Sequence, residues 1–186
     1  MLITKVKVGK VTNLSEARYC AGMGVDYLSF PVSAVDPKKY LEITGWVAGP
    51  AFGVEVENDN LDLLPQYSGD FVQINVELVD LVTAEKLIVR LSPDNWAVEK
   101  AKLIKAKARI LFLEFTIASF NPSVQAIVEG ASKEFQVLLN ISDAAQLDQL
   151  LKLPIAGISL EGEVELRPGL KEYPLAEILE KLDEEV

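Results

Sequence analysis

Short runs rich in Val, Ile, Leu and Phe alternate along this chain with segments in which apolar residues recur at helical spacing. The runs come at intervals of roughly 20 to 25 residues, which is typical of repeated strand–helix units around a parallel sheet. We predict eight strands, at residues 3–8, 27–31, 51–56, 71–75, 87–91, 110–115, 136–140 and 157–161. Eight such units favour a closed (β/α)8 barrel over an open doubly wound sheet. No Gly-x-Gly-x-x-Gly motif follows the first strand, which further disfavours a dinucleotide-binding open sheet.

The segments between the strands predict an outer layer of helices. Capping signatures mark three helix starts: Asn13 with Glu16, Asp36 before Pro37, and Asn121 before Pro122. We predict helices at residues 14–23, 38–46, 96–107, 144–151 and 175–184, and another that begins at residue 122. The helices after the third and fourth strands are expected to be weak, because Pro65 interrupts one and the other is short. In the helix at 96–107, the expected apolar side consists of Val98, Ala101, Leu103 and Ile104.

Composition narrows the class of protein. The 186 residues are 49% hydrophobic and 25% charged, with no compositional break, so we expect one globular barrel domain over residues 1–186. The net charge of −10, with the acidic excess scattered, disfavours nucleic acid or an anionic membrane as a partner. Cys20 is the single cysteine and histidine is absent, which excludes an intrachain disulfide, a thiolate–imidazole pair and the commonest metal ligand. Because no apolar segment is typical of a secretion signal or a membrane span, the expected location is the cytoplasm.

Polar residues are concentrated near the carboxyl ends of the predicted strands, where the active sites of such barrels lie. Side chains alternate between the interior and exterior of a barrel, so a polar set is expected to point inward at this end. The set consists of Lys7, Glu55, Gln73, Asn75, Arg90, Glu114, Asn140 and Glu161. One interpretation is a self-satisfied network in which Lys7 and Arg90 neutralise the carboxylates, because buried charges are costly unless paired. The other is a repurposed pocket in which Glu114 acts as acid or base and Arg90 binds an anion.

Several short motifs resemble those of the phosphoribosylanthranilate isomerase family. Residues 6–13, Val-Lys-Val-Gly-Lys-Val-Thr-Asn, are similar to its first strand, Lys-Ile-Cys-Gly-Ile-Thr-Asn. Residues 52–58, Phe-Gly-Val-Glu-Val-Glu-Asn, are similar to its Val-Gly-Val-Phe-Val-Asn, and residues 72–75, Val-Gln-Ile-Asn, to its Val-Gln-Leu-His. Near the C-terminus, residues 157–158 and 164–172 follow its Gly-Val-Asp-Val-Ser-Ser-Gly-Val-Glu-x-x-Pro-Gly-Val-Lys-Asp. The resemblance is collinear over essentially the whole chain, and it implies a (β/α)8 barrel.

The resemblance also implies a reaction. Members of this family catalyse an Amadori rearrangement of a sugar phosphate in tryptophan biosynthesis, by acid–base chemistry without a metal or an organic cofactor. A small-molecule ligand such as a sugar phosphate, and no cofactor, are therefore implied for this chain. The family's catalytic base, a cysteine, aligns with Gly9, and its catalytic acid, an aspartate, aligns with Glu114. Loss of the base alone should reduce the rate by roughly 10²- to 10⁴-fold, so we expect at most trace isomerase activity.

The family's ligand-binding residues are also replaced in this sequence. Its substrate-binding arginine aligns with Ser33 and its fourth-strand histidine with Asn75. Its phosphate-binding loops align with residues 139–141 and with Glu161-Gly162-Glu163, where two carboxylates would oppose a phosphate.

Other candidate binding residues are Lys10 at the mouth and Arg167 in the loop before the last helix. Three hypotheses remain open, because sites and not folds carry function. The first is an isomerase that uses Glu114 with another base, such as Glu55 or Lys10. The second is an enzyme that acts on a different small ligand. The third is a non-catalytic barrel used in binding or assembly, as a monomer or a homodimer.

Overall fold

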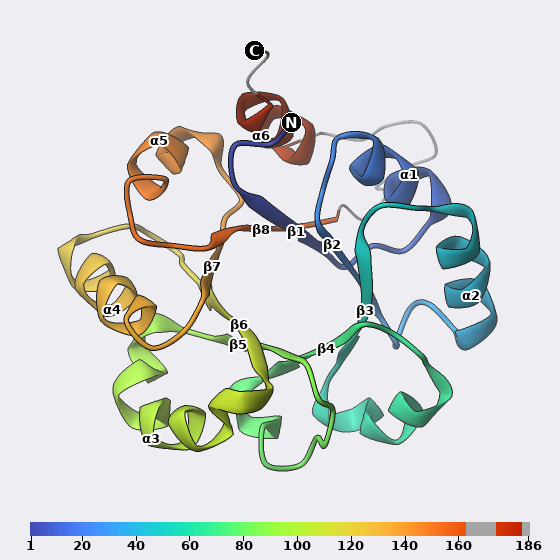
Figure 1. The fold of residues 1–186 in the computed structure, drawn as a ribbon, viewed down its shortest axis with the longest axis horizontal. Helices are drawn as coiled ribbons and strands as arrows, with labels where there is room; N and C mark the ends of the chain where they lie inside the picture. Colours follow the sequence, from blue (N-terminus) through green and yellow to red (C-terminus); the bar gives the residue numbers. More distant parts are fainter. Residues whose placement is uncertain (163–173, 184–186) are drawn as a thin grey trace.

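A computed structural model describes residues 1–162 and 174–183 of the chain. In these residues, eight parallel strands close into one barrel in chain order, with helices around the outside (Figure 1). The strands are β1 (Lys5–Gly9), β2 (Tyr27–Pro31), β3 (Ala51–Val56), β4 (Phe71–Asn75), β5 (Leu87–Leu91), β6 (Ile110–Thr116), β7 (Val137–Asn140) and β8 (Gly157–Glu161). Pairing of β1 with β8 closes the sheet. The predicted (β/α)8 barrel is therefore confirmed.

The outer layer follows the predicted helices closely where a capping residue starts them. The α-helices are α1 (Leu14–Gly22), α2 (Pro37–Trp46), α3 (Trp96–Ala106), α4 (Pro122–Ser132), α5 (Leu147–Leu150) and α6 (Pro174–Leu182). The 3-10 segments are η1 (Asn58–Gln66), η2 (Val76–Leu78), η3 (Pro93–Asn95), η4 (Lys107–Arg109) and η5 (Ala144–Gln146). The side chains of Asn13, Asp36 and Asn121 each accept a backbone N–H at the first turn of their helix, as predicted. After β3 and β4 the structure has only 3-10 segments, and η1 contains Pro65, so the predicted weakness of these two helices is confirmed.

The buried side of α3 differs from the prediction. Val98 is 81% exposed and Ile104 is 39% exposed, and of the predicted set only Leu103 is buried. Trp96, seven residues before Leu103, is buried instead, with its ring edge-on against aromatic rings of β6 and of the segment before β7. A large aromatic side chain at the helix start therefore determines which face of α3 lies on the barrel.

The barrel interior changes from apolar to polar along the strand direction. Phe71, Ile88, Phe112 and Leu138 form a buried cluster at the level where the strands begin. The ring of Tyr27 packs edge-on against Phe112, with 5.3 Å between the ring centroids. Toward the carboxyl ends, the inward positions carry charged and amide side chains instead. The apolar cluster thus forms a floor beneath the candidate site.

Candidate functional site

The site lies inside the barrel at the carboxyl ends of the strands and is centred on Glu114 of β6. Glu114 has no exposed surface, and both of its carboxylate oxygens are engaged. Lys7 Nζ of β1 lies 2.8 Å from Oε2, and Arg90 Nε of β5 lies 2.6 Å from Oε1. The Ser159 hydroxyl of β8 donates a hydrogen bond of 2.7 Å to Oε2. The predicted pairing of Lys7 and Arg90 with a carboxylate is therefore present, and Glu114 is the shared partner.

These contacts set the charge state of Glu114. Burial by itself opposes ionisation, but the charges of Lys7 and Arg90 and the hydrogen bonds from Lys7 and Ser159 outweigh it and lower the pKa of Glu114 to about 2. A carboxyl group with this pKa holds no proton near neutral pH. The arrangement consequently favours a structural anion at this position over a general acid.

A second set of ion pairs crosses the mouth above Glu114. Glu161, at the end of β8, lies 2.6 Å from Lys10 Nζ and 3.3 Å from Arg90 Nη2. Lys10 has a left-handed backbone with φ of 54°, which a residue with a side chain adopts only at a cost. Its N–H donates to Glu55 Oε1 at 2.6 Å, and this oxygen also accepts from the Ser29 hydroxyl at 2.7 Å. The contacts with Glu55 and Glu161 together hold Lys10 in this conformation.

The charges in this network balance. Lys7, Lys10 and Arg90 each form an ion pair with Glu114 or Glu161, whereas Glu55 accepts hydrogen bonds from the backbone N–H of Lys10 and from the Ser29 hydroxyl. The three cations are therefore already paired with carboxylates, and among them Nη2 of Arg90 is a buried nitrogen that makes no hydrogen bond to a described residue.

Gly9, which the sequence resemblance aligns with the family's catalytic base, is closely surrounded by the ends of two charged side chains. A Cβ atom built there would lie 2.7 Å from Glu55 Oε1 and 3.0 Å from Lys7 Nζ. A side chain at residue 9 would therefore require the ends of Glu55 and Lys7 to shift. The nearby Gly162 donates its N–H to the Gly9 carbonyl at 2.6 Å, and it too is closely approached, by the carboxylate of Glu16.

The remaining predicted site residues lie at the edges of the network. Gln73 is buried, and its amide nitrogen lies 3.5 Å from Glu114 Oε1. Asn75 is exposed at the end of β4. Asn140 is buried, and its amide nitrogen has no hydrogen-bond partner among the described residues. Arg167 lies outside the described residues.

Sequence reasoning missed Ser29 and Ser159, two buried hydroxyls that complete the network. Both occupy inward positions on their strands, and strand pairing places Ser159 beside Lys7. The available signal was a small polar residue within an apolar run, two positions before the strand end. Such a signal is weak, because a buried serine is unremarkable unless its neighbours across the barrel are known.

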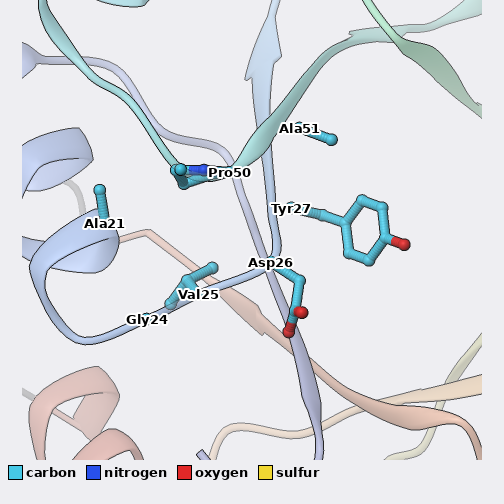
Figure 2. A pocket seen from close by; sticks show the side chains of 8 residues that line it. Ala21, Gly24, Val25, Asp26, Tyr27, Pro50 and Ala51 are labelled. Atoms are coloured by element: carbon cyan, nitrogen blue, oxygen red, sulfur yellow. The ribbon is translucent and has the colours of Figure 1, made fainter. Parts of the chain in front are cut away.

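The hollows formed by the described residues include three that are open to a ligand. One of about 370 Å³ lies at the amino ends of β2 and β3, between Gly24, Gly49 and Pro50 (Figure 2). Its carboxylate, Asp26, already accepts the N–H of Val6, and the rest of its wall is mostly small apolar residues. This is also the end of the barrel that serves stability in such folds, so we do not assign it a ligand.

The other two hollows lie at the mouth, on either side of the ion-pair network. One of about 200 Å³ has mainly apolar walls from the ends of β7 and β8 and from α6. The other, of about 170 Å³, has mainly polar walls from the ends of β4, β5 and β6. Among residues 1–162 and 174–183, no cluster of three or more potential metal-binding side chains occurs. None of the helices formed by these residues is long and apolar enough to cross a membrane.

Several solved structures of phosphoribosyl anthranilate isomerases have a fold similar to that of this chain. Phosphoribosyl anthranilate isomerase from Thermus thermophilus matches with a TM-score of 0.71 and 16% identity, over 96% of this chain and 98% of that one. A phosphoribosyl anthranilate isomerase in complex with reduced 1-(o-carboxyphenylamino)-1-deoxyribulose 5-phosphate matches with a TM-score of 0.70 and 15% identity, over 97% and 98%. Truncated 3-deoxy-D-arabino-heptulosonate 7-phosphate synthase from Thermotoga maritima matches with a TM-score of 0.66 and 14% identity, over 96% and 84%.

At the level of sequence, no family model and no curated protein matches the chain. Identities of 14 to 16% establish a common fold and leave the activity open. The chain therefore has the fold of the phosphoribosylanthranilate isomerases, as the sequence resemblance implied.

Proposed function

We propose that this chain is a diverged relative of phosphoribosylanthranilate isomerase that binds a small molecule at its mouth and no longer catalyses the isomerisation. The observation that carries the proposal is the burial of Glu114 between Lys7 and Arg90, at 2.8 and 2.6 Å. The common fold and the collinear motifs support the relationship, and the complex of one solved isomerase with a sugar-phosphate analogue supports a small-molecule ligand.

The chemistry of the reaction supports the loss of activity. The isomerisation needs a base to remove a proton from the sugar and an acid to protonate the ring oxygen. Gly9 offers no base, and the space beside it is filled by Glu55 and Lys7. Glu114 aligns with the acid, but with a pKa of about 2 it has no proton to donate at neutral pH. The family's own base is therefore missing, and the residue aligned with its acid is ionised.

An enzyme acting on another small ligand is the second candidate. It is favoured by Lys10 and Glu161, whose side chains are 49% and 36% exposed at the mouth and could exchange protons with a bound molecule. Replacement of Glu161 by Gln would abolish turnover of such a substrate, whereas a barrel that only binds would keep its affinity within a few-fold.

The direct test is an assay of phosphoribosylanthranilate isomerase activity with protein purified from a host that lacks this enzyme. The Thermus thermophilus isomerase, assayed at the same concentration, is the positive control. We expect at most trace turnover, because loss of the base alone should cost roughly 10²- to 10⁴-fold. Growth of a tryptophan auxotroph lacking the isomerase, rescued by this chain at normal expression, would overturn the proposal.

A further inference from the structure

The polar hollow at the ends of β4, β5 and β6 is one of the two parts of the mouth described above that the ion-pair network leaves open. It measures about 170 Å³. Its walls are formed by Asn75, Val76, Glu77, Arg90, Leu91, Ser92, Asn95 and Thr116. The ends of β4, β5 and β6 and the 3-10 segments that follow β4 and β5 supply these residues.

Hydrogen-bond donors and hydrogen-bond acceptors both line this hollow. Asn75, Asn95 and Thr116 are exposed, and their side chains make no hydrogen bond to another described residue. Amide and hydroxyl groups can each donate and accept a hydrogen bond. A ligand that carries several hydroxyl groups offers the same two capacities and therefore matches this wall.

The charges around the hollow disfavour an anion. Arg90 is the one cation in its wall, and its charge is already shared by Glu114 at 2.6 Å and Glu161 at 3.3 Å, although its Nη2 makes no hydrogen bond to a described residue. Glu77 adds an exposed carboxylate to the same wall. A phosphate or carboxylate placed here would be repelled by Glu77 and would compete with Glu114 and Glu161 for the one cation, which lowers its affinity relative to a neutral ligand.

The hollow also has a restricted size. The side chains of Val76 and Leu91 are buried beneath its wall, so the surface that faces a ligand is mainly polar. The volume lies below the roughly 300–1,000 Å³ of typical drug-sized ligand sites. A monosaccharide or a sugar alcohol is therefore a better fit in size than a nucleotide.

From this combination we propose that the β4–β6 hollow binds an uncharged polyol of monosaccharide size. This rests on the proposed function, since it specifies the small molecule that the mouth binds. The ligand lies to one side of the barrel axis, with its hydroxyl groups on Asn75, Asn95, Ser92 and Thr116. It is held without displacement of the Lys7–Glu114–Arg90 ion pairs beneath it.

The experiment is a titration of the whole protein with D-ribose, ribitol and D-glucose, followed by two-dimensional NMR of its amide groups. We expect saturable shifts at residues 75–77, 90–95 and 116, with a Kd on the order of millimolar for so small a ligand. D-Ribose 5-phosphate and inorganic phosphate are the charged counter-probes and should bind more weakly than the neutral sugars.

Substitutions of single residues test whether the named side chains contact the ligand. Asn75→Ala and Asn95→Ala should each weaken the affinity about 3- to 10-fold, the usual effect of one lost hydrogen bond. Gln149→Ala, which removes an exposed amide from α5, is the matched control and should leave the affinity unchanged. Thermal melts establish that each variant is folded.

Two results would overturn this inference. One is the absence of saturable shifts with every neutral polyol, and the other is tighter binding of the phosphorylated sugar or of phosphate. Either result leaves the loss of isomerase activity standing, because that rests on Gly9 and Glu114. Measurable isomerase turnover would instead contradict the proposed function, whatever the polyols do.

Discussion

Replacement of Glu114 by Gln tests the ion-pair network directly, because the substitution keeps the shape of the side chain and removes its charge. In the wild type this carboxylate is fully buried against Lys7 and Arg90. In the variant, Lys7 has no carboxylate beside it, while Arg90 keeps its contact with Glu161. The loss in free energy of unfolding should come mainly from Lys7, whose buried charge then has no carboxylate partner.

Two independent arguments give the same magnitude. A pKa lowered from 4.5 to about 2 corresponds to about 3 kcal/mol of stability at neutral pH, since one unit is worth about 1.4 kcal/mol. Removal of one partner from a buried ion pair costs about 3–5 kcal/mol. For a chain of this length, 1 kcal/mol changes the melting temperature by about 2–4 °C, so a loss of about 3 kcal/mol lowers it by about 6–12 °C.

The assay is thermal unfolding at neutral pH, with urea unfolding for the free energy. A Glu114→Gln protein that melts at or above the wild-type temperature would refute the reasoning, and it would indicate an open, hydrated pocket around this residue. Glu134→Gln is the matched control, because it makes the same change in an exposed pair with Lys107 and should leave the melting temperature unchanged. Adding Lys7→Met to Glu114→Gln should recover part of the loss, since the unpaired lysine is then removed.

Three other predictions follow from the same contacts. Because the folded-state pKa of Glu114 lies below its ordinary value of 4.5, its stabilisation is complete above about pH 5 and is lost as the pH falls toward 2. Urea unfolding across this range should show the gap between wild type and Glu114→Gln closing, and a constant gap would contradict the ionised pair. Gly9→Cys should lower the melting temperature and restore no isomerase activity, because its Cβ would lie 2.7 Å from Glu55 Oε1. A large gain in turnover would contradict this, because it would mean that Glu55 and Lys7 can move aside without loss of the site. Gly157→Ala should cost about 1–3 kcal/mol in urea unfolding, because the added methyl group meets the backbone of Lys5 where β8 closes on β1, and wild-type stability would show that the closure is loose.

The positions of the strands were predictable from the sequence. Strands buried on both faces consist of nearly continuous apolar runs, and turn residues bound them, so β2, β3, β4, β5 and β8 have the predicted limits. The helix starts at Asn13, Asp36 and Asn121 were also predictable from the sequence. A capping side chain accepts a hydrogen bond from a backbone N–H only two or three residues away. These features depend on neighbours in the chain and therefore appear in the sequence.

The orientation of the outer layer was less predictable. The apolar residues of α3 are compatible with more than one buried face, and Val98, which was expected to be buried, is exposed. The choice depends on where Trp96 finds aromatic partners on other elements, and the sequence pattern of one helix does not contain that information.

For the candidate site, the alternation along each strand predicted the charged and amide residues of the inward set, although it missed the buried hydroxyls of Ser29 and Ser159. It left open whether they form a pocket or a network of ion pairs. The register of the closed barrel decided the outcome by placing Arg90 directly beside Glu114, and by bringing Lys7 to the same carboxylate across 107 positions of the chain. A buried charge depends on the partner that reaches it, and the tertiary structure alone supplies that partner.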